Sequence, residues 1–496
     1  MQYLSTNFFP QHLVLPLAAA GAFALLSLAL HFNGLYGQDA HEYLRLSRAY
    51  FDQMHGLPYQ PQGRGDLVFA VGYPLAGALL RFTGLSAPTA LQLVSWLSAA
   101  AALYGFDACI RALSPGAHRW SRRLYTAVAL GLSGYFVRAG FTVMSDALGL
   151  ALLLGAFHYG LRAVEGRRGR DAVWAALFSG LSVLTRFAVA PLLAPLLLGV
   201  AVALWRVPSR PGRRDWNAGW LGLSVLAGLL MLLPHFLLKS HVAVSPFSHS
   251  LLLDWSPLNL FRATLTDASG TVNYRFPNLV FILYPLAWPG FLPPLPLLFL
   301  MAKRTDFLLP AKRVLLVSLA VYLLFLGGLP SQNSRYLLPA FALILLLMFP
   351  AWDRFVSYGF YFFKKLTTAL VLGAVLLQVF FAVKIMWPVW QRNRLERLAA
   401  EKVQAASKPG AAVYAFDLDV ALHTYLPDEP VKGLWENRYD RFEEGALFLF
   451  NEPRLRQQWQ GRNPMLNWET LVQGYELAPV DSLPEGWTLY RIVKAK

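Results

Sequence analysis

The sequence contains one cysteine, Cys109, and it lies in an apolar run. An internal disulfide is therefore excluded, and the cysteine content does not indicate a redox compartment. Charged side chains are also scarce, at 15% of the chain, whereas soluble domains carry about 25%. Combined with 56% hydrophobic residues, this scarcity predicts a membrane protein.

Acidic residues are the scarcer charged type, with 28 Asp and Glu against 44 Lys and Arg, which gives a net charge of +16. Such an excess is often the mark of a nucleic-acid-binding protein. Here the basic residues cluster in short loops between apolar runs. We therefore expect a membrane lipid partner and no nucleic acid.

Apolar runs recur along the first 390 residues, and a crossing helix needs about 20 such residues. The first run lacks a basic flank and a clean cleavage site, so we interpret it as a retained anchor. Residues 69–82 are too short to cross and predict an interfacial or re-entrant segment. The eleven predicted spans are 13–32, 88–110, 124–138, 144–161, 172–186, 187–205, 217–238, 279–301, 314–330, 336–352 and 367–388.

The basic residues are unequally shared between the two sides that these spans define. Five short loops on one side carry 19 Lys and Arg, and the longer loops opposite carry ten before the tail. The positive-inside rule places the crowded side in the cytoplasm. We therefore expect a protein of the plasma (inner) membrane, with a cytoplasmic N-terminus and extracytoplasmic positions for Asp39 and the tail.

The tail differs in composition from the rest of the chain. It is polar and contains β-like runs at 411–416 and 446–450, separated by Pro, Gly, Asp and Asn turn signals. The predicted fold is mainly α, with about eleven transmembrane helices in residues 1–390 and a small α/β domain in 391–496. The loop 33–87 is expected to contain interfacial helices.

Charged residues interrupt three of the apolar stretches. Arg138 and Asp146 lie in the stretch 124–161, and Arg186 divides the stretch 172–205. Arg335 lies between the predicted spans 314–330 and 336–352. A charge at the bilayer centre costs about 2.5–3.5 kcal/mol, so these residues are expected at helix ends. Counting the crossings places all of these ends on the outer side, together with Asp39.

The order of these segments resembles the membrane glycosyltransferases of the C-type (GT-C) fold, which use polyprenyl-phosphate sugars and include protein O-mannosyltransferases and the lipid A aminoarabinose transferase. The resemblance covers roughly residues 1–350. Many relatives have adjacent Asp-Glu in the first loop, whereas here Ala40 follows Asp39 and Glu42 comes three residues later. The matching segments are the Asp39 loop, Gly-Tyr-Pro-Leu at 72–75, Met-Ser-Asp-Ala-Leu at 144–148, Leu-Thr-Arg-Phe at 184–187 and Ser-Arg-Tyr-Leu-Leu-Pro at 334–339.

The resemblance implies an inverting transfer of a sugar from a polyprenyl phosphate to an outer glycan, lipid or protein. Asp39 would be the catalytic base for the acceptor hydroxyl. The side chains expected at the donor phosphate are Arg138, Arg186 and Arg335, since guanidinium pairs bidentately with phosphate. The candidates for a second acid are Glu42, Asp66 and Asp146.

Each candidate also has a structural interpretation. Asp39 and Glu42 have the spacing of a capping box, and Ser145 and Asp146 the look of a helix start. The three arginines would then extend to the interface or pair with Asp146. Asp66, in Gly-Arg-Gly-Asp, has the composition of an ordinary turn.

Nothing in the sequence demands a cofactor, although some members of the resembled family use a divalent metal. His41 has no second histidine or cysteine at metal spacing nearby, so we expect it to be exposed. Asp417-Leu418-Asp419 predicts a strand end or turn in the tail. Two other functions fit the composition, a flippase or transporter of lipid-linked sugars and a polysaccharide polymerase.

Overall fold

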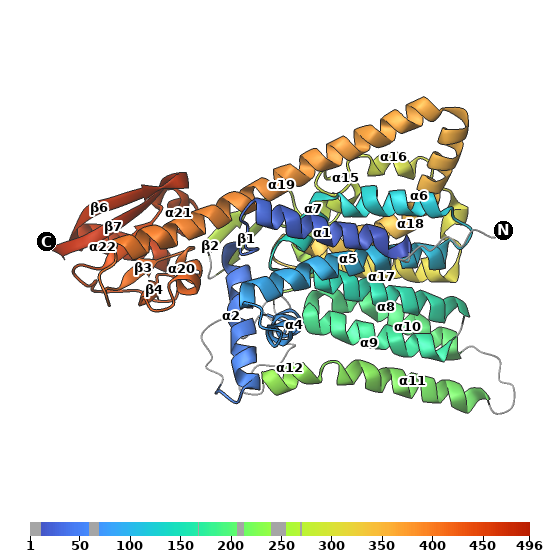
Figure 1. Ribbon diagram of the computed structural model, residues 1–496, viewed down its shortest axis with the longest axis horizontal. Helices are drawn as coiled ribbons and strands as arrows, with labels where there is room; N and C mark the ends of the chain where they lie inside the picture. The colour runs from blue at the N-terminus through green and yellow to red at the C-terminus, as the bar shows by residue number, and fades with distance from the viewer. Residues whose placement is uncertain (1–10, 59–68, 167, 206–212, 240–253, 268–269) are drawn as a thin grey trace, which may run out of the picture. The chain divides into compact units, whose positions relative to one another are not determined.

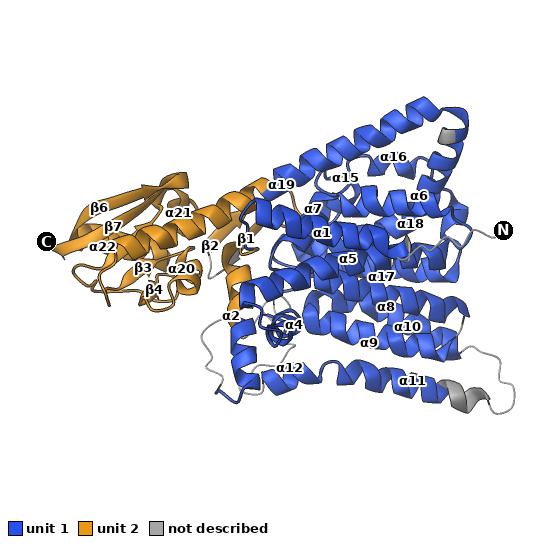
Figure 2. Cartoon of the chain, viewed as in Figure 1, with its two compact units in different colours: residues 1–33, 46–261, 278–386 blue, residues 34–45, 262–277, 387–496 orange. Residues whose placement is uncertain are grey.

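The computed structural model describes residues 11–58, 69–166, 168–205, 213–239, 254–267 and 270–496. It divides into two compact units (Figure 2). The first contains residues 1–33, 46–261 and 278–386, and the second contains 34–45, 262–277 and 387–496. Helices α2 (Gly37–Met54) and α19 (Lys364–Ala406) contribute residues to both units.

The first unit is a bundle of helices (Figure 1), in which α8 packs against α5 and α9, and α9 packs against α11. Its elements are η1 (Gln11–Leu13), α1 (Val14–Ala29), α4 (Gly72–Arg81), α5 (Ala87–Leu113), α6 (Arg119–Tyr125), η2 (Thr126–Gly131), α7 (Gly134–Phe141), α8 (Asp146–Gly166), α9 (Gly169–Thr185), η3 (Phe187–Val189), α10 (Ala190–Trp205), α11 (Arg213–Leu230), α12 (Leu233–Leu238), η4 (Pro257–Phe261), α14 (Asn278–Phe281), α15 (Tyr284–Ala287), α16 (Leu295–Phe299), η5 (Arg304–Phe307), α17 (Pro310–Gly327), η6 (Ser334–Tyr336) and α18 (Leu337–Phe362).

Seven helices in the described part of the chain are long and apolar enough to cross a membrane. They coincide with seven of the eleven predicted spans, and this confirms the mainly helical membrane fold. Two further predicted spans fall on the shorter helices α1, with 16 residues, and α9, with 17. The remaining two, 124–138 and 279–301, are chains of short helical pieces.

These two interruptions have local causes. Ser133 accepts a hydrogen bond from the amide of Phe136 at 3.3 Å, so it caps a new helix in the middle of the first apolar run. In the second run Pro285, Pro289 and Pro293 recur every four residues. Each proline lacks an amide hydrogen and disfavours a continuous helix, so the run forms α14, α15 and α16.

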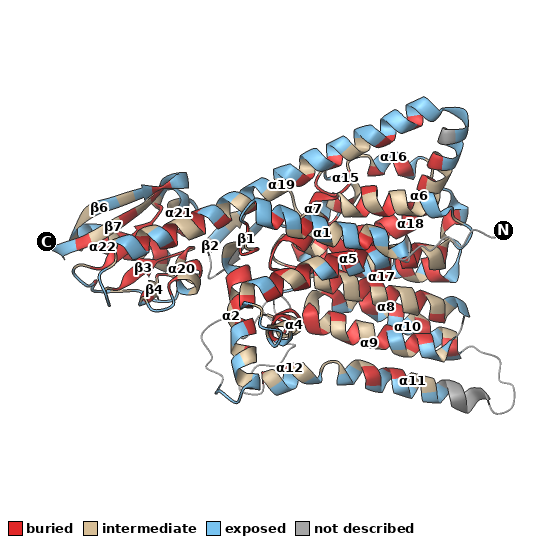
Figure 3. Cartoon of the chain, in the orientation of Figure 1, coloured by how far each residue is buried: buried red, intermediate tan, exposed pale blue. Residues whose placement is uncertain are grey.

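The core of this unit lies around α18, as the burial colouring shows (Figure 3). Of the most apolar 18-residue stretch, 83% is buried in α18 with its preceding turn, whereas 17% is buried in α19. Apolar side chains that remain exposed on α19 and α11 suit a surface in contact with lipid tails. Helices α9 and α11 approach closely, since a Cβ on Gly180 would lie 2.6 Å from the carbonyl oxygen of Gly228.

The second unit contains a five-stranded sheet with the order β4-β3-β5-β7-β6. Strand β3 is parallel to β4 and β5, whereas β7 is antiparallel to both β5 and β6. A separate hairpin joins β1 to β2. The elements are β1 (Thr264–Asp267), β2 (Gly270–Asn273), β3 (Val413–Ala415), α20 (Asp419–Tyr425), β4 (Val431–Gly433), β5 (Leu447–Phe450), α21 (Glu452–Trp459), α22 (Asn463–Gly474), β6 (Tyr475–Leu483), η7 (Pro484–Gly486) and β7 (Trp487–Ala495).

Successive side chains of a strand alternate between the two faces of a sheet. In this sheet the strands carry apolar side chains on both faces, and helices pack against each face. Val413 packs with Leu422 of α20 and with Val403 near the end of α19. Tyr414 points to the other face, where it packs among residues that include Trp468 of α22. The α/β character predicted for the tail is therefore confirmed, and β3 and β5 lie within the two predicted β-like runs.

Candidate active site

Three of the predicted charged residues meet in the first unit. Arg335 donates from Nε to Oδ2 of Asp146 at 2.9 Å, and Arg186 donates from Nη1 to Oδ1 of the same carboxylate. The Asp146 side chain is 4% exposed, and those of Arg186 and Arg335 are 8% and 13% exposed. One buried carboxylate thus binds two guanidinium groups.

The ends of three helical elements bring these side chains together. Asp146 is the first residue of α8, Arg186 directly follows α9, and Arg335 lies in η6 before α18. Ser182 of α9 donates to the carbonyl of Gly149 of α8 at 3.2 Å, which fixes the first two ends against each other.

Two tyrosines support the same cluster, Tyr322 of α17 and Tyr336 of η6. The Tyr322 hydroxyl donates to the carbonyl oxygen of Tyr336 at 2.8 Å. The Arg186 guanidinium carbon lies 4.7 Å from the centroid of the Tyr336 ring, within the range of a cation–π contact. The guanidinium is therefore held by a carboxylate and by an aromatic face.

We name this group the Asp146 cluster (Asp146, Arg186 and Arg335). It contains two guanidinium groups and one carboxylate, and it includes the pairing with Asp146 that the structural interpretation expects. Guanidinium groups are the side chains best suited to bidentate contacts with a phosphate.

The other residues predicted for the first unit are placed as follows. Arg138 lies near the end of α7 and is half-buried, and its carbonyl oxygen accepts from the amide of Thr142 at 3.0 Å and from its hydroxyl at 2.9 Å. Asp66 lies outside the described residues.

Asp39 and Glu42 lie on α2, in the second unit. The helix begins at Gly37, so Asp39 lies in its first turn, two residues after the start, instead of at the cap. A carboxylate in a first turn is favoured by the helix dipole. Asp39 is half-buried, and Glu42 accepts from Arg45 Nε at 2.8 Å.

The expectation that His41 is exposed is wrong. Its side chain is 1% exposed, and its Nε2 lies 3.2 Å from Oε2 of Glu396, which is equally buried. Glu396 also accepts from Arg392 Nε at 2.8 Å. The sequence interpretation missed Glu396 and Arg392, although a Glu four residues after an Arg at the polar end of a long apolar helix is a visible signal.

In the Asp417-Leu418-Asp419 segment the first two residues lie in the bend after β3, near the strand end that the sequence predicts, and Asp419 is the first residue of α20. Asp417 has a φ of 67° and accepts from Arg392 Nη1 at 2.9 Å. Burial, with a smaller contribution from Asp417, raises the pKa of Asp419 to about 7. In the described residues no group of three His, Cys, Asp or Glu side chains is arranged to hold a metal.

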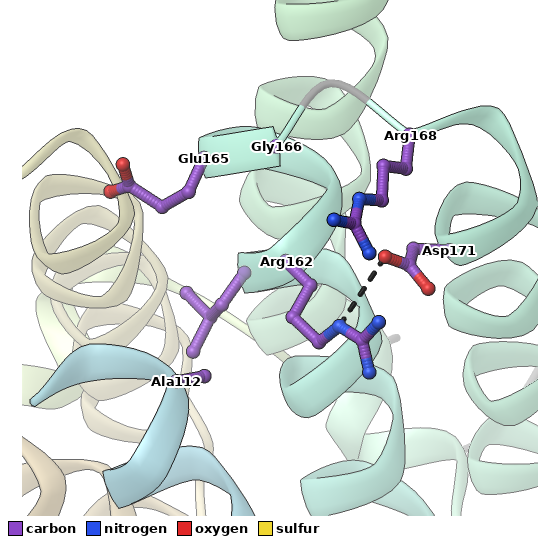
Figure 4. A pocket seen from close by; sticks show the side chains of 7 residues that line it. Ala112, Arg162, Glu165, Gly166, Arg168 and Asp171 are labelled. Atoms are coloured by element: carbon purple, nitrogen blue, oxygen red, sulfur yellow. Dashed lines mark ion pairs between the residues drawn. The ribbon is translucent and has the colours of Figure 1, made fainter. Parts of the chain in front are cut away.

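A pocket of about 210 Å³ lies at the other end of α8 and α9 from the Asp146 cluster. Arg162 and Arg168 flank Asp171 there, whereas Glu165 points away from this group (Figure 4). Glu165 accepts from the amide of Ala311 at 3.0 Å, and Asp171 pairs with Arg162 at 3.3 Å. With 21 residues rising about 1.5 Å each, α8 separates the pocket from the Asp146 cluster by about 30 Å.

The architecture defines an integral membrane protein with the GT-C fold. It is similar to the crystal structure of ArnT from Cupriavidus metallidurans bound to undecaprenyl phosphate, with a TM-score of 0.62 and 15% identity, over 96% of this chain and 97% of that one. The apo state of ArnT from the same organism gives a TM-score of 0.58 at 15% identity, over 95% and 98%. The predicted resemblance is thereby confirmed at the level of the fold.

The sequence profile of the family described as Dolichyl-phosphate-mannose-protein mannosyltransferase matches residues 119–237. This segment includes Arg138, Asp146 and Arg186. No curated protein matches the sequence.

Proposed function

We propose that the chain is an inverting membrane glycosyltransferase that takes a sugar from a polyprenyl phosphate. The observation that carries this proposal is the likeness, over nearly the whole chain, to ArnT bound to undecaprenyl phosphate. The match of residues 119–237 to a mannosyltransferase family supports it independently. The acceptor in this proposal is a glycan, lipid or protein on the outer face, where the positive-inside rule places Asp39.

The residues divide the reaction between them. Asp39 removes the proton from the acceptor hydroxyl, whose oxygen then forms a bond to the anomeric carbon of the sugar. The bond from that carbon to the phosphate oxygen breaks, and the electron pair leaves with the polyprenyl phosphate. Attack from the face opposite the leaving group inverts the anomeric configuration.

The departing phosphate needs positive charge, and the Asp146 cluster supplies it. Arg186 and Arg335 are fixed by one carboxylate, so their charge requires little reorganisation when the phosphate leaves. Arg138, near the end of α7, is proposed for the same phosphate because the count of crossings puts it on the same side as Arg186 and Arg335. Asp146 then acts as the anchor of two arginines, and Glu42 and Asp66 stay candidates for a second acid.

A donor assay with the purified full chain tests this proposal against its rivals. Undecaprenyl phosphate carrying one labelled pentose or hexose is incubated with envelope lipid, polysaccharide or protein fractions as acceptors. We expect release of undecaprenyl phosphate and transfer of a single sugar. Transfer of a whole glycan chain would indicate a polymerase, and movement of intact donor across a vesicle without cleavage would indicate a flippase.

A further inference from the structure

We propose that Glu396 and His41 are positioning residues that fix the first turn of α2, and with it Asp39, for the transfer reaction. This inference rests on the proposed function, because it gives the fixed turn a catalytic purpose. The residues that carry it all lie in the second unit. From the sequence alone, no function is assigned to Glu396 or His41.

The two residues that bracket Asp39 bind the same carboxylate. The amide of Gly37 donates to Oε1 of Glu396 at 3.0 Å, and His41 Nε2 lies 3.2 Å from Oε2. Asp39 lies midway between Gly37 and His41 in the first turn of α2. The two oxygens of one buried side chain therefore bind the backbone amide of Gly37 before the proposed base and the side chain of His41 after it.

One further contact and the backbone conformation of one glycine fix the same segment. Asn393, three residues before Glu396 on α19, donates from Nδ2 to the carbonyl oxygen of Leu35 at 2.7 Å. Gly37 has a φ of +63°, and a Cβ there would meet no atom within 4 Å. Glycine is thus required at this position for its backbone conformation and not for space.

Three contacts hold the His41 ring in place. At Nε2 the partner is the Glu396 carboxylate, which only accepts, so Nε2 is the donor of this hydrogen bond. At Nδ1 the ring lies 2.9 Å from the hydroxyl oxygen of Thr424. The edge of the ring contacts the Tyr425 ring at 5.6 Å between centroids.

Opposite charges alternate outward from Glu396 to Arg392 and Asp417. Glu396 lies between His41 and Arg392, and Arg392 lies between Glu396 and Asp417. Because Glu396 and His41 are each 1% exposed, neither has water as an alternative partner. Such a network holds its members in one geometry and resists small movements of the turn.

The expected consequence is kinetic. A general base acts only within hydrogen-bond reach of the proton that it removes, and a misplacement of about 1 Å can lower a rate about 100-fold. Loss of the Glu396 carboxylate should therefore lower kcat about 10- to 100-fold, while the KM for the donor changes less than about threefold.

The test measures kcat and KM of the full chain for the labelled donor in Glu396→Ala and Glu396→Gln. Gly37→Ala serves as a second variant, because it strains the turn and leaves every side chain of the network in place. The control is Glu452→Gln, which removes an exposed ion pair with Arg456 on α21. We expect the first three variants to lose kcat and the control to retain it.

A double-mutant comparison separates positioning from a purely structural role. If Glu396 acts through Asp39, Glu396→Ala should cause little further loss in an Asp39→Ala background. An equal loss in both backgrounds, or a kcat within twofold of the wild type for Glu396→Ala and Gly37→Ala, would overturn the inference. Absence of transfer by the wild type would instead overturn the proposed function and this inference with it.

Discussion

At the scale of the residue, two buried carboxylates organise the charged groups of this chain. Asp146 binds two arginines that lie 40 and 189 residues later in the sequence. Glu396 binds Arg392 and also His41, which lies 355 residues earlier. Each carboxylate thus joins segments that local sequence patterns cannot connect.

The first residue-scale prediction concerns Asp146→Asn. This change removes the negative charge that both buried guanidinium groups bind, so the free energy of unfolding should fall by about 3–5 kcal/mol. Thermal unfolding of the full chain in detergent measures the effect. Asp481→Asn, which breaks a solvent-exposed pair with Lys402, is the control and should leave the unfolding midpoint nearly unchanged. Equal unfolding midpoints for Asp146→Asn and wild type would contradict the prediction.

The second concerns the pH dependence that Asp419 confers. Its folded pKa of about 7 lies above the ordinary value, so between about pH 4 and pH 7 the folded state binds more protons than the unfolded one. The contribution of Asp419 to the free energy of unfolding should therefore decrease as the pH rises through this window and stay lower above it.

Asp419→Asn should remove this decrease, so that at pH 8 the variant is more stable than the wild type by about 1–4 kcal/mol. Unfolding midpoints at pH 4, 5, 6, 7 and 8, followed by tryptophan fluorescence, give the comparison. Asp428→Asn, at an exposed position, serves as the control and should follow the wild-type profile. A difference in stability between Asp419→Asn and the wild type that does not grow with pH over this window would contradict the assigned cause.

The sequence predicts some of these contacts between charged residues, but not all of them. Asp146, Arg186 and Arg335 were placed at helix ends on one side because a charge inside a span is unfavourable, and the structure brings these three together. The burial of His41 was not predicted, because its neighbours are polar and its partner Glu396 is remote in sequence. Local spacing contains no information on such a contact.

At the scale of the element, hydropathy predicts where apolar helices lie but not where they break. The predicted span 88–110 corresponds to α5, which is extended to Ala87–Leu113 by the Ser86 cap at its start. In 124–138 the same average hides Ser133, whose side chain caps α7. In 279–301 it hides prolines that remove backbone donors. Single polar or proline positions therefore decide the boundaries that an average over many residues conceals.

The element-scale prediction tests the close contact between α9 and α11. Gly180→Ala places a methyl group 2.6 Å from the carbonyl oxygen of Gly228, so the helices must move apart, at a cost of about 1–3 kcal/mol. Gly222→Ala on α11 is the matched control, because a Cβ there meets nothing within 4 Å. We expect a lower unfolding midpoint for the first variant and an unchanged or higher one for the second. Equal stabilities would show that the two helices do not approach this closely.

At the scale of the whole molecule, the apolar runs predict a helical membrane domain and the polar tail predicts a small α/β domain, and the structure has both. The fold is shared with ArnT over 96% of this chain at 15% identity. Such conservation of fold at low identity follows because many apolar sequences satisfy a membrane helix, whereas its end points and charged positions are restricted. The proposed donor and outer-face acceptor belong to this scale, because the proposal rests on a likeness that extends over nearly the whole chain.

The central claim is that this chain transfers a sugar with Asp39 as base, and one measurement tests it most directly. The initial rate of labelled sugar transfer from undecaprenyl phosphate is compared between the wild type, Asp39→Ala and Asp52→Asn, the last a control at an exposed position of the same helix. Loss of a general base lowers a rate about 10²- to 10⁴-fold. We expect that loss for Asp39→Ala alone, with unchanged yield and unfolding midpoint. Near-normal transfer by Asp39→Ala would contradict the account.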